Sequence, residues 1–157
     1  AMEIKGDKPE DELYKGRISY LLGENKDAIS YLEKAKEHKQ MLASYYLGLA
    51  YDANGDSDKA KKCIAEYIKS GVATSYDLYE LGMQEMQDGN YKNALTYFNS
   101  GLELEKVPNK QNLMKSAIAA YEYSGDFDSA KKMMKEYLKA YPDDEEAKHE
   151  NTFLETR

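Results

Sequence analysis

The amino-acid sequence predicts an all-α solenoid of four helical hairpins followed by a C-terminal capping helix, and two periodic series of small residues indicate it. The first series contains the glycines expected to end the first helix of each hairpin: Gly23, Gly55, Gly89 and Gly125. The second contains alanines inside the second helices: Ala28, Ala60, Ala94 and Ala130. Both series advance by 32, 34 and 36 residues along the 157-residue chain. A glycine ends a helix readily because it adopts a left-handed conformation without a Cβ clash.

The predicted helices follow one another in four pairs, at about 10–22 and 25–37, 41–53 and 57–69, 75–88 and 91–105, and 110–124 and 127–140. The corresponding hairpins span about 9–40, 41–74, 75–110 and 111–144. A polar residue that can cap the second helix follows each turn glycine: Glu24, Asp56, Asn90 and Asp126. The segment from Thr74 to Asp77 is typical of a capping box, and Pro108 ends the third hairpin because proline cannot continue a helix.

The two ends of the chain lead to different expectations. Acids at 143–146 favour the start of a helix over 143–155, which is expected to bury Ala147, Phe153 and Leu154 against the last hairpin.

We predict a single domain over residues 9–157. Residues 1–8 are expected to be a cloning remnant, Ala1-Met2, followed by an inter-repeat linker. That linker favours the interpretation that the chain is the C-terminal fragment of a longer array.

Composition argues against two classes of partner. The net charge is −7, from 22 basic and 29 acidic residues, and no dense run of Lys and Arg occurs. Nucleic acids and anionic membrane surfaces attract basic surfaces, so neither is an expected partner. No apolar run approaches the ~20 residues of a membrane span, so no direct membrane contact by this stretch is predicted.

The sequence predicts no enzyme, no cofactor and no metal site. His38 and His149 lie far apart in polar segments and are expected to be solvated. The single cysteine, Cys63, is expected to be a small buried apolar residue. Neither a Gly-rich phosphate loop nor a nucleophile elbow occurs, and the acidic clusters lack the ligand spacing of a calcium loop.

The repeating unit resembles the tetratricopeptide repeat over about residues 9–155. The third hairpin carries the resemblance most fully, in Leu81-Gly82, Gly89-Asn90-Tyr91, Ala94 and Phe98. The resemblance implies a right-handed superhelical solenoid in which the first helices line a concave groove. It also implies that a neighbouring helix approaches closely at three glycines of the first helices: Gly16, Gly48 and Gly82.

Alternate hairpins differ at a second small position. That position is Ala35 in the first hairpin and Gly101 in the third, but Tyr67 in the second and Tyr137 in the fourth. We expect each tyrosine to spread the packing locally. The segments 56–62 and 126–132 share one pattern and the segments 26–31 and 92–97 another, so the array resembles a duplicated pair of hairpins.

The resemblance implies a partner-binding groove lined by first-helix residues: Leu13, Arg17, Tyr20, Tyr45, Leu49, Asp52, Tyr76, Tyr79, Met83, Met86, Lys115, Ala119, Glu122 and Tyr123. Four of them share one helix face and are called the Tyr/Met stripe below: Tyr76, Tyr79, Met83 and Met86. The stripe suits peptide recognition but equally suits packing against neighbouring helices, which periodicity cannot separate. Only Arg17 and Lys115 could hold a terminal carboxylate, and they lie two repeats apart, so a carboxylate clamp is not expected.

Two functions follow as hypotheses. The first is a non-enzymatic scaffold that binds a peptide or helix in the concave groove. The alternative is a structural or self-assembly segment of a longer array, in which the N-terminal edge mediates homo-oligomerisation. The segment 147–157 is also similar to the end of repeat-containing lipoproteins of Gram-positive gut bacteria, which implies the cell envelope. The cytoplasm is the alternative location.

Overall fold

The structure is a computed structural model that describes residues 8–157, and in this part of the chain all regular structure is helical. The helices within it are α1 Pro9–Leu21, α2 Asn25–Glu37, α3 Met41–Ala53, α4 Ser57–Lys69, α5 Ser75–Gln87, α6 Tyr91–Leu102, α7 Lys110–Tyr123, α8 Phe127–Ala140 and α9 Glu145–Glu155. The predicted all-α fold and order of hairpins are therefore confirmed. The expectations for residues 1–7 lie outside the described residues.

Two predicted helix limits need correction. Helix α6 ends at Leu102 instead of 105, and α9 begins at Glu145 instead of 143. In the second case Asp144 itself is the N-cap, because its side chain accepts a hydrogen bond from the backbone N–H of Ala147 at 3.1 Å. The acids therefore start the helix as expected, but two residues later.

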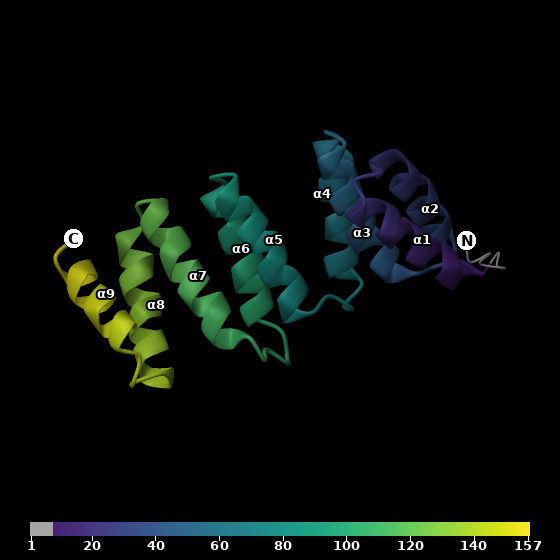
Figure 1. Cartoon of the computed structure of the whole chain (residues 1–157). Helices are drawn as coiled ribbons and strands as arrows, with labels where there is room; N and C mark the ends of the chain where they lie inside the picture. Colours follow the sequence, from purple (N-terminus) through teal and green to yellow (C-terminus); the bar gives the residue numbers. More distant parts are fainter. Residues whose placement is uncertain (1–7) are drawn as a thin grey trace. The chain divides into compact units, whose positions relative to one another are not determined.

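The chain divides into two compact units, the first ending at Ala73 and the second running from Thr74 to Arg157. In the first unit, α1 to α4 pack in sequence order and α1 also lies against α3 (Figure 1). In the second unit, α5 to α9 pack in the same way and α5 also lies against α7. First helices thus lie side by side within each unit. The prediction of a single domain over 9–157 stays a prediction.

The four turn glycines all adopt the left-handed conformation, with φ between 74° and 84°. The residue after each glycine closes the preceding helix through its backbone; Glu24 N–H, for example, donates to Ser19 O at 2.8 Å. This is the Schellman arrangement, in which the chain turns back on the last carbonyls of the helix. Among these four residues only Asp126 also caps the second helix with its side chain, on Ser129 N at 3.1 Å. The capping predicted for the other three is absent.

The predicted capping box at the start of α5 is confirmed. Thr74 Oγ1 accepts from Asp77 N at 3.3 Å, and Asp77 Oδ2 accepts from Thr74 N at 2.8 Å. Nearby, the buried Asn109 donates from Nδ2 to Ser75 O at 3.1 Å, which ties the start of α7 to the start of α5.

Close approach at the first-helix glycines is also confirmed. A Cβ added to Gly16 would lie 2.5 Å from Leu32 Cγ, and one added to Gly48 would lie 2.5 Å from Ile64 Cδ1. At Gly82 it would lie 2.3 Å from Phe98 Cε1. In each case one side chain of the second helix occupies the space that a methyl group would need, so that side chain would have to shift if the glycine were replaced.

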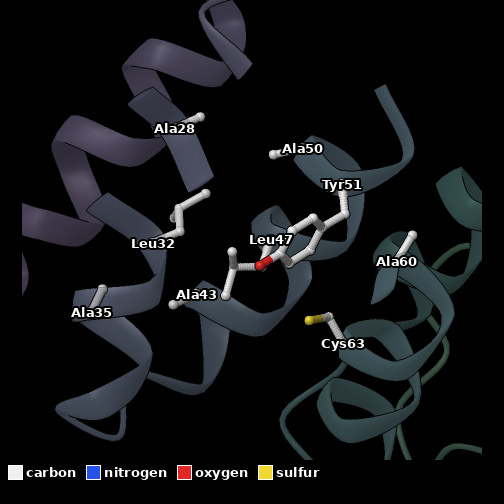
Figure 2. Close-up of a cluster of buried hydrophobic side chains, with 9 residues drawn as sticks. All are labelled: Ala28, Leu32, Ala35, Ala43, Leu47, Ala50, Tyr51, Ala60 and Cys63. Carbon is white, nitrogen blue, oxygen red and sulfur yellow. The ribbon is translucent and has the colours of Figure 1, made fainter. Parts of the chain in front are cut away.

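The core of the first unit is shown in Figure 2, where Leu32 of α2 and Leu47 and Tyr51 of α3 lie between neighbouring helices. Cys63 of α4 is buried at its edge, as predicted, and burial raises the pKa of its thiol. Small residues complete this cluster: Ala28, Ala35, Ala43, Ala50 and Ala60.

The second unit buries Phe98, Leu113 and Tyr137 among its largest core side chains. Ala147 and Leu154 are buried as predicted, but the burial expected for Phe153 is wrong, because its side chain is 46% exposed. The guanidinium carbon of Arg157 lies 4.6 Å from the Phe153 ring centre, so the ring packs under a cation at the surface. His38 and His149 are both exposed.

Candidate functional site

In the first unit, an aromatic and charged cluster joins α1 to α3. The guanidinium carbon of Arg17 lies 4.9 Å from the ring centre of Tyr46, and the Tyr20 ring meets the same Tyr46 ring at 6.3 Å. Burial, followed by the charge of Asp52, raises the pKa of Tyr20. Leu13 is half-buried and packs against the core of the first unit. The structure therefore brings four of the predicted groove residues together.

Tyr45 takes a different position from its predicted neighbours. Its side chain is only 9% exposed and packs between the rings of Tyr46, at 5.2 Å, and Tyr67, at 5.3 Å. It therefore belongs mainly to the core. Leu49 is half-buried.

In the second unit, the Tyr/Met stripe lies on α5 and is partly packed. Tyr76 is 55% exposed, and the other three members are half-buried against the core. The ring centre of Tyr79 lies 6.2 Å from that of Phe98, and Ser116 of α7 donates a weak hydrogen bond to Met83 Sδ at 3.6 Å. One side of the stripe thus supports the core while part of its surface stays accessible beside α7.

Predicted residues of α7 open onto a pocket, here called the α7/α9 pocket. Its volume is about 370 Å³, and it is lined by Lys115, Ile118, Ala119, Glu122, Met134, Tyr137, Glu146, Ala147 and Glu150. Three of these were predicted as groove residues: Lys115, Ala119 and Glu122. Tyr123 does not line it; the exposed Tyr123 ring stacks on Tyr91 with ring centres 5.4 Å apart.

One edge of the α7/α9 pocket holds a compact ionic network. Lys115 Nζ lies 2.8 Å from Asp144 Oδ2 and 3.6 Å from Glu146 Oε2. Asp144 also accepts hydrogen bonds from the Tyr137 hydroxyl and from Ala147 N. Lys115, Tyr137 and Ala147 together hold the pKa of Asp144 well below its usual range, and Asp144 in turn raises the pKa of Lys115. The Lys115 charge is therefore already engaged.

The other edge carries two neighbouring carboxylates without such a cation. Burial, then the charge of Glu150 and a hydrogen bond to it, raises the pKa of Glu122. The Oε1 atom of Glu122 is buried and has no hydrogen-bond partner within residues 8–157. This edge therefore carries two carboxyl groups that have no ion-pair partner within residues 8–157.

Sequence reasoning missed three contributors to these surfaces. Tyr46, the centre of the α1/α3 cluster, follows Tyr45 directly and was not assigned to the groove. Glu146 and Glu150 were read only as part of a capping helix. Their spacing of four residues, which places them on one face of α9, was the signal available.

Three further features bear on the class of function. No group of three or more His, Cys, Asp or Glu side chains suited to a metal ion occurs between residues 8 and 157. None of the helices in that range combines the length and apolarity needed to cross a membrane. A groove of about 510 Å³ between α2 and α4 is lined by Cys63, Tyr51 and Glu33, among others. In this groove the Tyr51 hydroxyl donates a hydrogen bond to the Glu33 carboxylate.

Comparison with known proteins gives a family match in two places. Residues 42–70 and 111–144 match the family described as tetratricopeptide repeat. A search of the curated proteins found no match. Among solved structures, a MamA RS-1 ArsTM double mutant is similar, with a TM-score of 0.64, 18% identity, and coverage of 97% of this chain and 85% of that one. Two segments of the chain thus match the tetratricopeptide repeat, and the solved structure supports the same helical fold.

A second solved structure has a similar helical fold. It is a Podosopora anserina putative kinesin light chain with nearly identical TPR-like repeats, with a TM-score of 0.59 and 15% identity; the similarity covers 95% of this chain and 87% of that one. The first and third hairpins lie outside the matched segments, and each makes a close glycine contact like that of Gly48 in the second hairpin. Tetratricopeptide repeats serve in general as scaffolds that bind other proteins or peptides, and no catalytic family is indicated.

Proposed function

We propose that this protein is a non-enzymatic interaction module that binds a peptide or a helix on α5 and α7, the first helices of its second unit. The observation that carries the proposal is the partial exposure of the Tyr/Met stripe beside α7. Tyrosine offers a rigid amphipathic surface and methionine adapts its shape, so a partner could cover these side chains without disturbing the core.

The test is selection from a random-peptide display library on the wild-type protein, followed by affinity measurement. Tyr79→Ala combined with Met83→Ala is expected to weaken the selected peptides by at least about tenfold, because interface aromatic anchors carry much of the binding energy. Leu95→Ala with Met133→Ala is the matched control, since both side chains pack on the same core from second helices. Equal loss in both variants, with circular dichroism showing both folded, would contradict a groove ligand.

A second candidate function is self-assembly through α1. Three of its apolar side chains, together with its C-cap residue Leu22, form what we call the N-terminal stripe: Tyr14, Ile18, Leu21 and Leu22, which are 38–76% exposed. Exposed apolar stripes of this kind mark interaction sites. If this function holds, the mass in sedimentation equilibrium rises with concentration, and Ile18→Lys with Leu21→Lys abolishes the rise. A monomer at all concentrations would exclude it.

We also propose an envelope location, which rests on the similarity of residues 147–157 to the ends of lipoproteins. Metabolic labelling of the full gene product with a fatty-acid analogue in its native host is expected to label it. An unlabelled product would overturn this proposal and leave the interaction role intact.

A further inference from the structure

The α7/α9 pocket has one apolar wall. Ile118 of α7, Met134 of α8 and Ala147 of α9 line it, and all three are buried. Its volume of about 370 Å³ lies within the range of about 300–1,000 Å³ typical of ligand sites. A partner side chain entering here would therefore rest its stem on apolar surface.

The charged residues around the α7/α9 pocket determine which terminal group the partner side chain can carry. Lys115 pairs with Asp144 at 2.8 Å and with Glu146 at 3.6 Å, and within residues 8–157 it forms no ion pair with Glu122 or Glu150. Glu122 and Glu150 face each other closely enough for mutual repulsion, and Glu122 Oε1 is buried without a hydrogen-bond partner among residues 8–157. A buried carboxylate oxygen without a partner is costly unless a donor or a cation reaches it.

Other ligand classes fit less well. A carboxylate or phosphate would meet the acids Glu122 and Glu150, while the one cation in the pocket lining, Lys115, is already paired with Asp144 and Glu146. A purely apolar side chain would bury Glu122 further and leave its oxygen without a donor. A cationic group on a flexible hydrocarbon chain fits both the apolar wall and the acidic edge of the pocket, because Lys and Arg bury their methylenes while presenting their charge.

We propose that the α7/α9 pocket accepts a Lys or Arg side chain of the partner peptide, with its methylenes on Ile118, Met134 and Ala147 and its cation beside Glu122 and Glu150. This inference rests on the proposed function and adds the chemistry of the residue that the partner must carry. It places the specificity of the module at the junction of the last hairpin and the capping helix.

The test uses three capped tripeptides as probes: acetyl-Gly-Lys-Gly-amide, acetyl-Gly-Arg-Gly-amide and acetyl-Gly-norleucine-Gly-amide. Norleucine supplies the same hydrocarbon stem without the charge. Titration of the ¹⁵N-labelled full chain is expected to give saturable amide shifts in α7 and α9 with the Lys and Arg probes only. In Glu122→Gln with Glu150→Gln the apparent affinity is expected to fall by at least about tenfold, because charge-assisted hydrogen bonds are lost.

The matched control is Glu103→Gln with Glu136→Gln, which removes the same charge from two exposed acids outside the pocket. It is expected to bind like the wild type, and dispersed amide spectra show that each variant is folded. Equal shifts with norleucine, equal loss in the control, or no shift in α7 and α9 would each overturn the inference. If display peptides still depend on Tyr79 and Met83, the proposed function survives that result; if no peptide is selected but the Lys probe binds, only the proposed function fails.

Discussion

Gly82 decides how closely α5 and α6 can pack, because a Cβ there would lie 2.3 Å from the Phe98 ring. We expect Gly82→Ala to lower the free energy of unfolding by about 1–3 kcal/mol, the usual cost of overpacking a core. Gly101→Ala is the comparison, since its Cβ would lie 3.1 Å from Leu113 and the neighbour needs to move less. Urea denaturation measures both, and a loss at Gly101 equal to that at Gly82 would contradict the prediction.

Glu122 makes stability depend on pH in a defined direction. Its pKa in the folded protein is raised, first by burial and then by Glu150, so between its ordinary and raised values the folded state binds more protons than the unfolded state. Stability from this group is therefore present below its ordinary pKa of 4.5 and is lost as the pH rises through the raised value. Glu122→Gln is expected to raise the melting temperature at pH 7 and to change it little near pH 4. Calorimetry checks this, with Glu136→Gln as the control; a decrease at pH 7 would contradict it.

At the level of single residues, some features were predictable and others were not. The glycine turns could be predicted because only glycine adopts their conformation without strain. The absence of side-chain caps at Glu24, Asp56 and Asn90 could not be predicted from the turn. Asp126 makes the same backbone hydrogen bond to its preceding helix and does cap the next one, so the turn alone does not direct the side chain. Likewise, the pairing of Glu122 with Glu150 depends on how α9 rotates against α7, which no local pattern specifies.

Helix α5 begins at a capping box, a reciprocal pair of hydrogen bonds between Thr74 and Asp77. We expect Thr74→Ala to lower the free energy of unfolding by about 1 kcal/mol, the typical effect of losing an N-cap. Thr96→Ala is the control: Thr96 is exposed in the middle of α6 and bonds only Lys92 O, so its loss should be near neutral. Thermal denaturation of the two variants separates the outcomes, and similar melting temperatures would refute a role for the capping box.

The helices themselves were predictable from periodicity to within a few residues, because amphipathic spacing and turn glycines agree along the whole array. The ends of the helices were less predictable: α6 ends at Leu102, whereas the sequence pattern predicts a helix as far as residue 105. The burial expected for Phe153 failed for a related reason. Helical spacing places Phe153 one residue from the buried Leu154 but does not say which of the two faces α8.

Across the whole molecule, stability is expected to be uneven. Helix α1 keeps an exposed apolar face, the N-terminal stripe, whereas α8 buries Met134 and Tyr137 between two neighbours. Local opening follows the amount of buried contact, so amides of α1 are expected to exchange hydrogen faster than those of α8. Hydrogen exchange measured by mass spectrometry on the full chain tests this. Protection in α1 equal to that in α8 would show that the chain unfolds as one cooperative unit.

The contacts at Gly16, Gly48 and Gly82 have a consequence for the ancestry of the chain. Each glycine and the side chain that fills its space, Leu32, Ile64 or Phe98, belong to the same hairpin. A gene segment that encodes one hairpin therefore encodes both the glycine and the side chain that packs against it. Duplication of that segment inserts a hairpin whose two helices pack together without compensating substitutions elsewhere. Within a hairpin the two positions must change together, so a bulkier residue in place of the glycine survives only beside a smaller partner. Arrays of this kind can lengthen by duplication while each copy diverges in the residues that it shows to partners.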